Sequence, residues 1–156
     1  MNSTLTFGFI IALVGGIAIG VQGVFINILG QNMGSVRTGL ASHMGGTLVG
    51  AILMGVIILS NPNLKSIQIT PQIILYSLLA GGFGMVIVMS VSFAFPRIGL
   101  VAGQSALIVA QLAVGIVVDT YALAGGDPLP MDRQRLLGLV IVAIGSYLLL
   151  PHQSST

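Results

Sequence analysis

The charged residues of this 156-residue chain all lie at or between the ends of five long apolar runs. There are five Lys or Arg, three Asp and no Glu. A soluble domain carries charge on about a quarter of its residues, because its surface faces water. Moving one Arg, Lys or Asp to the middle of a bilayer costs about 2.5–3.5 kcal/mol. Since 55% of the residues are hydrophobic, we expect lipid to cover most of the surface.

The apolar runs are long enough to cross a membrane as helices. A helical crossing needs about 20 apolar residues, whereas a barrel strand would alternate over about 10. The first run has no Lys or Arg before it and stays apolar to Leu29, so we expect a retained span rather than a cleaved signal peptide. The sequence predicts an all-α membrane protein, a single five-helix transmembrane domain over residues 1–156. The expected spans are 5–29, 38–60, 72–95, 98–118 and 134–150.

Proline, glycine and asparagine mark the expected joints between the runs. Gly30–Arg37 should join the first two runs, and Asn61-Pro62-Asn63 should end the second. The segment Pro96-Arg97-Ile98-Gly99 predicts a tight turn that sets the third and fourth runs antiparallel. We expect Asp119 to be the first residue beyond the fourth run, and Pro151 to end the fifth.

Small residues recur at four-residue spacing in three of the runs, and the chain has 22 Gly. In lipid, small residues let helix backbones approach closely. Tight packing is the favoured explanation for any single glycine, but three such stripes predict a compact bundle with hinges available. The stripes are Ala12, Gly16 and Gly20, then Ser42, Gly46 and Gly50, then Ser77 and Gly81.

Five amide and imidazole side chains lie within the predicted spans: Gln22, Asn27, His43, Gln104 and Gln111. A polar group in hydrocarbon needs a partner or a water-lined cavity. Gln104 and Gln111 are seven residues apart, so they lie about 20° from each other around a helix. We interpret the five as substrate-binding residues of a polar cavity. The alternative is a set of interhelical hydrogen bonds, each worth about 0.6 kcal/mol.

Asp119 and His43 are the candidates for gating or coupling. The helix dipole disfavours an anion at a helix C-terminus, so something should compensate Asp119. It is either solvated at the membrane interface or a gating or proton-coupling carboxylate. Histidine is the side chain that most readily changes charge near neutral pH, but His43 could equally stay neutral and bonded to a carbonyl. We expect Arg37 and Arg97 to lie in turns and to reach lipid headgroups.

The residue inventory argues against catalysis and against metal or cofactor binding. The chain has no Cys and no Glu, and its two His are more than a hundred residues apart. It has no Gly-rich phosphate loop followed by Lys. A net charge of +2 gives no argument for a nucleic-acid partner. We therefore expect no enzyme, no metal and no cofactor, and a small molecule and the lipid bilayer as partners.

Positive charge barely favours one orientation in the membrane. With five crossings, the N-terminus shares a side with Lys65, Arg133 and Arg135, and the other side holds Arg37 and Arg97. Three positive charges on one side against two on the other give almost no bias in orientation. We hypothesise dual topology, in which copies insert both ways and pair as an antiparallel homodimer; an N-terminus inside is the fallback. Such a pair would supply the inverted repeat that many transporters carry within one chain.

Short motifs along nearly the whole chain resemble the YdcZ family, long a domain of unknown function, of the drug/metabolite transporter superfamily. The most specific stretch runs from Gln111 through Asp119 to Arg135-Leu136-Leu137-Gly138. The other matching motifs are Gly81-Gly82-Phe83-Gly84, Phe95-Pro96-Arg97-Ile98-Gly99, Gln22, Asn27-Ile28-Leu29-Gly30 and Gly34-Ser35.

The resemblance implies a five-helix half-transporter of the inner membrane. It would export a small molecule by alternating access as a dimer, with the substrate path between the two copies. Gln22, Asn27, Gln111 and Asp119 match motif positions of the family. Relatives in the small multidrug-resistance branch bind protons and cations with a membrane-embedded Glu, and this chain has none. A neutral, zwitterionic or anionic substrate therefore fits better. The alternative is a non-transporting membrane subunit that scaffolds a partner protein.

Overall fold

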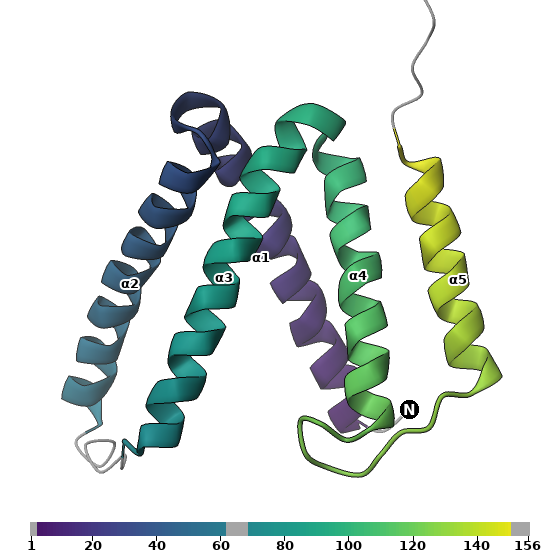
Figure 1. Ribbon diagram of the computed structural model, residues 1–156. Coiled ribbons are helices and arrows are strands. Elements are labelled where there is room, and N and C mark those ends of the chain that lie inside the picture. The colour runs from purple at the N-terminus through teal and green to yellow at the C-terminus, as the bar shows by residue number, and fades with distance from the viewer. Residues whose placement is uncertain (1–2, 62–68, 151–156) are drawn as a thin grey trace, which may run out of the picture. The chain divides into compact units, whose positions relative to one another are not determined.

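Five α-helices account for the regular structure of the described residues, which contain no strand (Figure 1). The structure is a computed structural model that describes residues 3–61 and 69–150. This confirms the predicted all-α class. The helices are α1 (Ser3–Met33), α2 (Ser35–Ser60), α3 (Pro71–Ile98), α4 (Leu100–Thr120) and α5 (Arg133–Leu148).

Four of these helices, α1 to α4, are long and apolar enough to cross a membrane. The fifth is shorter. Helix α5 has 16 residues, which gives a length of about 24 Å against a hydrocarbon core of about 30 Å. Four spans therefore have the length and composition of membrane helices, and a fifth crossing by α5 stays a prediction.

The joint between the first two spans is shorter than Gly30–Arg37, and that prediction was wrong. Helix α1 continues to Met33 and α2 begins at Ser35, so only Gly34 breaks the helix. The polar end of α1 stays helical because its side chains bond to groups four residues earlier, as Asn32 does to the carbonyl of Ile28 at 2.7 Å. Gly34 has φ +78°, a left-handed conformation that favours glycine.

Pro96 lies inside α3 rather than in a turn, which corrects the joint predicted between the third and fourth runs. Proline removes its own N–H from the helix, but a helix can continue after it for its last few residues. Here α3 runs to Ile98, and the Gly99 N–H donates to the Phe95 carbonyl at 3.0 Å. The chain turns at Gly99 alone, where φ is +85°.

The last two helices also begin or end near, but not at, the predicted residues. Helix α4 ends at Thr120, so Asp119 lies in its last turn rather than beyond it. Helix α5 begins at Arg133 because Asp132 caps it, accepting a hydrogen bond from the Arg135 N–H at 2.7 Å. The predicted breakers Pro62, Asn63 and Pro151 and the loop cation Lys65 lie outside the described residues.

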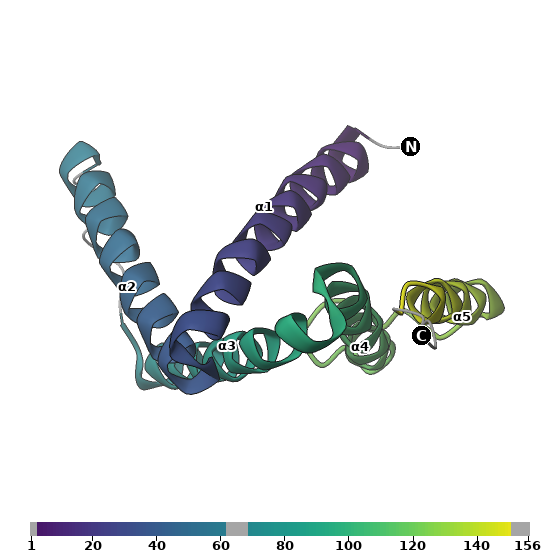
Figure 2. The same ribbon diagram turned by 90° about the horizontal axis from the view of Figure 1, so that it is seen from above.

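The chain divides into two compact units, Met1–Phe93 and Ala94–Thr156. In the first unit, α1 and α2 lie close together beside Gly34 and diverge away from it (Figures 1 and 2). The buried residues of this unit gather near that turn, at the end of α1, the start of α2 and the second half of α3. They include Ile26, Thr38, Val88, Val91 and Ser92.

Close helix approaches in the first unit occur at glycines outside the predicted stripes. A Cβ at Gly30 would lie 2.6 Å from the carbonyl oxygen of Ser92, and a Cβ at Gly39 would lie 2.7 Å from the side chain of Met89. The stripe glycines have open space where a Cβ would be, so the stripes do not make the helix contacts of the described chain. These open positions are Gly16, Gly20, Gly46, Gly50 and Gly81.

In the second unit, α4 packs against α5. The ring of Phe95, which is 2% exposed, occupies the space beside Gly103 where any Cβ would overlap it. The Ser146 hydroxyl donates to the Ser105 hydroxyl at 3.0 Å and so links α5 to α4. Ser105 in turn donates to the Ala102 carbonyl at 2.9 Å. One aromatic contact and one short polar chain thus help to hold this unit together.

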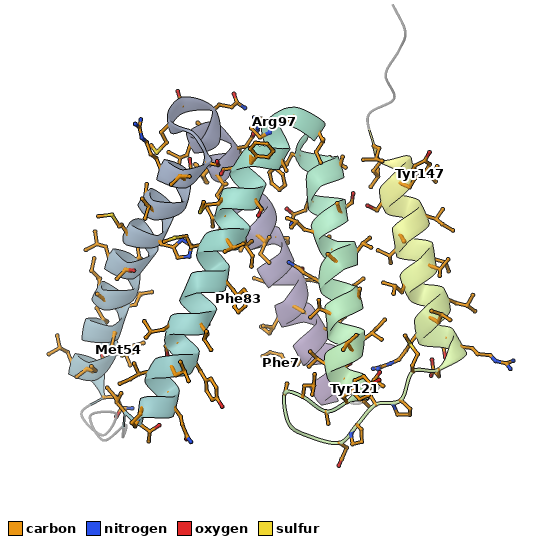
Figure 3. All side chains as sticks on the ribbon, viewed as in Figure 1. Phe7, Met54, Phe83, Arg97, Tyr121 and Tyr147 are labelled. Carbon is orange, nitrogen blue, oxygen red and sulfur yellow. The ribbon has the colours of Figure 1, made fainter. Side chains whose placement is uncertain are left out.

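Large apolar side chains project from the helices along most of their length (Figure 3). Phe7 is 67% exposed and Phe83 is 69% exposed in the single chain. An apolar surface of this extent marks contact with lipid or with other protein. It agrees with the expectation that lipid covers much of this surface.

Candidate functional site

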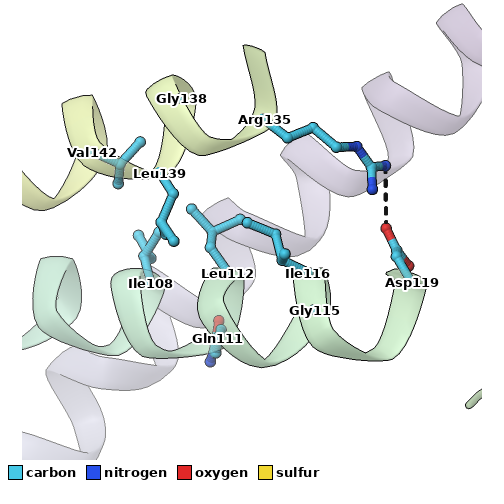
Figure 4. A pocket seen from close by; sticks show the side chains of 10 residues that line it. All are labelled: Ile108, Gln111, Leu112, Gly115, Ile116, Asp119, Arg135, Gly138, Leu139 and Val142. Carbon is cyan, nitrogen blue, oxygen red and sulfur yellow. Dashed lines mark hydrogen bonds and ion pairs between the residues drawn. The ribbon is translucent and has the colours of Figure 1, made fainter. Parts of the chain in front are cut away.

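The second unit has a hollow of about 480 Å³ between α4 and α5. Figure 4 shows Ile108, Leu112 and Leu139 between the two helices, with Asp119 and Arg135 at one end. The lining is apolar apart from that pair and Gln111. The full lining is Ile108, Gln111, Leu112, Gly115, Ile116, Asp119, Arg135, Gly138, Leu139 and Val142.

The end of this hollow is an ion pair that connects two helix ends. Nη2 of Arg135 lies 3.3 Å from Oδ2 of Asp119, and the two side chains are 33% and 46% exposed. The loop between the helices is bonded to both residues. The Leu129 N–H donates to the Asp119 carbonyl at 2.9 Å, and Nη1 of Arg135 donates to the Leu129 carbonyl at 3.4 Å.

We expected some group to offset the unfavourable interaction of the Asp119 carboxylate with its helix dipole. That group is the guanidinium of Arg135. Sequence reasoning counted Arg135 as a topological charge and as part of a family motif, but did not pair it with Asp119. The available signal was that both residues flank the same interhelical joint, one at each end.

Two hollows of the first unit have His43 in common. The first, about 380 Å³, brings together Gln22 of α1 and His43 of α2. The second, about 490 Å³, also includes His43 and is otherwise largely apolar. The first is lined by Gln22, Ser42, His43, Gly46, Thr47 and Val88. The second is lined by Leu40, His43, Met44, Thr47, Leu48, Ala51 and Met85.

Thr47 is the residue of this site that sequence reasoning missed. It lines both hollows, and its hydroxyl donates to the His43 carbonyl at 2.8 Å. Its position four residues after His43 on a predicted helix was the signal, because residues four apart share a helix face.

Two predicted residues lie outside these three hollows. Asn27 is half-buried, and its Oδ1 accepts a hydrogen bond from Nε2 of Gln31 at 3.3 Å. Gln104 is half-buried on α4, two turns before Gln111. Of the predicted substrate-binding set, Gln22 and His43 share one hollow, and Gln111 lines another with Asp119. Their role in binding substrate stays a prediction.

The polar groups of these hollows are suited to binding a solute. Among the described residues, no group of three or more His, Cys, Asp or Glu side chains could hold a metal ion. One hollow offers amide, hydroxyl and imidazole groups, and another offers an amide and an ion pair beside an apolar wall. Pockets of this size, mostly apolar with a few polar groups, are typical of small-molecule sites.

Residues 7–148 match the profile of a family described as "Putative inner membrane exporter, YdcZ". The chain belongs to the YdcZ family. The match extends from α1 to the end of α5 and confirms the resemblance drawn from the sequence motifs. Comparison with curated proteins and with solved structures gives no significant match.

Membership of the YdcZ family settles the compartment. Its description names the inner membrane, and four helices have the length and composition of membrane spans. The chain is a multi-pass protein of the inner membrane. The YdcZ family is described as one of membrane exporters, which are transporters rather than enzymes.

Proposed function

We propose that the chain exports a small molecule across the inner membrane as a homodimer with alternating access. One observation carries the proposal: the hollow between α4 and α5 joins an apolar wall to an amide and an ion pair, and it is open at the side. Such a half-open site suits a substrate path that a second copy completes. The YdcZ family description supports export, and we place the family in the drug/metabolite transporter superfamily.

The amide and imidazole side chains are proposed to bind the substrate, and Asp119 and His43 to gate or couple its movement. In this assignment the substrate is neutral, zwitterionic or anionic, because the chain has no Glu to hold a cation. The ion pair of Asp119 with Arg135 could then open to receive a charged group of either sign. The proposed substrate-binding residues are Gln22, Asn27, His43, Gln104 and Gln111.

The proposed dimer is antiparallel. Two copies inserted in opposite directions would form the inverted repeat of a ten-helix transporter. The exposed apolar side chains of α1 and α2 supply a surface for such pairing as well as for lipid. The weak charge bias of the chain permits both insertions.

Flux through purified protein in proteoliposomes tests the proposal. The panel should contain neutral, zwitterionic and anionic solutes, with protein-free liposomes as the control. Substrate-dependent flux of at least one class supports export. Absence of flux for every class, together with stable co-purification of another membrane protein, would instead favour a non-transporting subunit, which the same exposed apolar surface could serve.

A further inference from the structure

The hydrogen bond made by His43 fixes the tautomer of its ring. Nδ1 lies 3.0 Å from the carbonyl oxygen of Gly39, one turn earlier in α2. A carbonyl oxygen can only accept, so Nδ1 must carry the hydrogen. The neutral ring then has a bare lone pair on Nε2.

Nε2 faces α3 at a position where the facing residue has no side chain. A Cβ added to Gly84 would lie 3.0 Å from Nε2, closer than ordinary van der Waals contact. A Cβ at Gly81 or Gly82, on the same helix, would meet nothing within 4 Å. Gly84 therefore keeps the lone pair of Nε2 uncovered.

The same ring lies where the two hollows of the first unit meet. His43 and Thr47 are the residues common to both linings. The Thr47 hydroxyl already donates to the His43 carbonyl. Among the described residues, none donates a hydrogen bond to Nε2.

No other charged or titratable side chain lines either hollow. Helix α1 carries none. On α2 the nearest is Arg37, six residues before His43, about 9 Å along the helix axis. On the α3 segment of this unit, the charged or titratable residue nearest to Gly84 is Tyr76. It lies eight residues before Gly84, about 12 Å along the helix axis. His43 is thus the one ionisable residue in the linings of the two hollows.

We propose that Nε2 of His43 is the proton-binding site that couples export to a proton gradient. A proton from one aqueous side adds to the Nε2 lone pair and forms the imidazolium, while Nδ1 keeps its hydrogen bond to Gly39. The same proton leaves from Nε2 to the other side after the access state changes. This inference rests on the proposed transport function and assigns its coupling group.

Nitrogen NMR of the full chain in lipid bilayers, with labelled histidine, tests the site without any transport assay. The chain has two histidines, and His43→Gln assigns the signals by removing one pair. At alkaline pH we expect His43 to show a protonated Nδ1 and an unprotonated Nε2, and Nε2 to gain a proton on acidification. A neutral ring protonated on Nε2 would overturn the inference.

Two glycine substitutions on α3 give a matched control. Gly84→Ala should shift the ring resonances of His43 or change its tautomer, because the new methyl group meets Nε2. Gly82→Ala should leave them unchanged, because its methyl group meets nothing. Equal spectra for the two variants would overturn the placement of Nε2 against Gly84.

Proteoliposome flux then tests the coupling. A pH gradient should drive solute accumulation by the wild-type chain, and His43→Gln should lose that accumulation. Equal gradient-driven accumulation by both would overturn coupling through His43 and leave export standing. If the wild-type chain moves no solute at all, export fails and the coupling role with it, whereas the NMR titration still decides whether Nε2 binds a proton.

Discussion

Nη2 of Arg135 lies 3.3 Å from Oδ2 of Asp119, and both charges stand against the dipole of their own helix. Asp119 is an anion in the last turn of α4, and Arg135 is a cation in the first turn of α5. Helix dipoles favour the opposite arrangement. A partly exposed pair of this kind adds only about 0–1 kcal/mol. Stability alone therefore does not account for the sign of the two charges.

Exchanging the two charges separates stability from function. In Asp119→Arg combined with Arg135→Asp, the pair can still form, and each charge now agrees with its helix dipole. We expect unchanged or higher stability in detergent, by about 0.3–1 kcal/mol per helix end, and loss of solute flux. Denaturant unfolding and proteoliposome flux measure the two effects.

Asp119→Arg alone is the control for this exchange. It places two cations together, so the free energy of unfolding should fall relative to the double exchange. Wild-type flux in the exchanged chain would show that the pair serves only to connect the helices.

Gly30 should be intolerant of alanine, because the close approach of α1 to α3 depends on it. A Cβ there would lie 2.6 Å from the Ser92 carbonyl oxygen, which is backbone and cannot rotate away. Overpacking of this kind costs about 1–3 kcal/mol. Gly15→Ala, in the same helix, meets nothing within 4 Å and should hold or raise stability, since Ala is favoured over Gly in helices by about 0.5–1 kcal/mol. Thermal unfolding in detergent compares the two variants, and equal melting temperatures would contradict the contact.

The helices were predictable because each one appears directly in the sequence as a long apolar run. The residues at which one helix ends and the next begins were less predictable. Gln31 and Asn32 are polar like a loop but extend α1 by bonding within it. Pro96 is a common helix breaker, yet α3 continues past it to Ile98. Gly34 and Gly99 mark the actual breaks through their positive φ, a property that their residue type permits but does not impose.

The sequence did not predict which side chains of different helices contact each other, and the physical reason is a different one. Whether Ser105 faces Ser146, or Asp119 faces Arg135, depends on how far each helix is rotated about its axis. Uniformly apolar helices carry little periodic signal that would set this rotation. A single polar cavity was predicted from residue type alone, and of its five residues only two share a hollow, Gln22 and His43. The five were Gln22, Asn27, His43, Gln104 and Gln111.

The hydrogen bond between Ser146 and Ser105 should contribute measurably to the packing of α5 on α4. At 3.0 Å, with both side chains half-buried, it is a well-formed interhelical bond. A double-mutant cycle of Ser105→Ala and Ser146→Ala should give a coupling energy near the membrane average of about 0.6 kcal/mol. Unfolding in mixed micelles supplies the four stabilities. Strict additivity of the two single substitutions would contradict the bond.

Gln111 should be needed for flux but not for folding. Gln111 is the uncharged polar residue in the lining of the hollow between α4 and α5, so Gln111→Leu leaves no uncharged hydrogen-bonding residue in that lining. We expect flux to be lost while membrane insertion and thermal stability are kept. Gln72→Leu is the matched control, because Gln72 lies at the start of α3 and lines none of the three hollows. Unchanged flux in Gln111→Leu would remove that residue from the site.

Dual topology can be measured cleanly because the chain has no cysteine. Asn32→Cys and Ala124→Cys place single exposed thiols with three predicted spans between them. If copies insert both ways, a membrane-impermeant thiol reagent should label part of each population from outside, and the rest only after permeabilisation.

Adding Ala124→Lys to the Asn32→Cys chain tests the charge bias. It gives the side that holds Lys65, Arg133 and Arg135 a fourth cation, against two on the other side. By the positive-inside rule, this should move the thiol at position 32 outward in most copies. Complete labelling of one thiol and none of the other, before that change, would rule out the antiparallel pair.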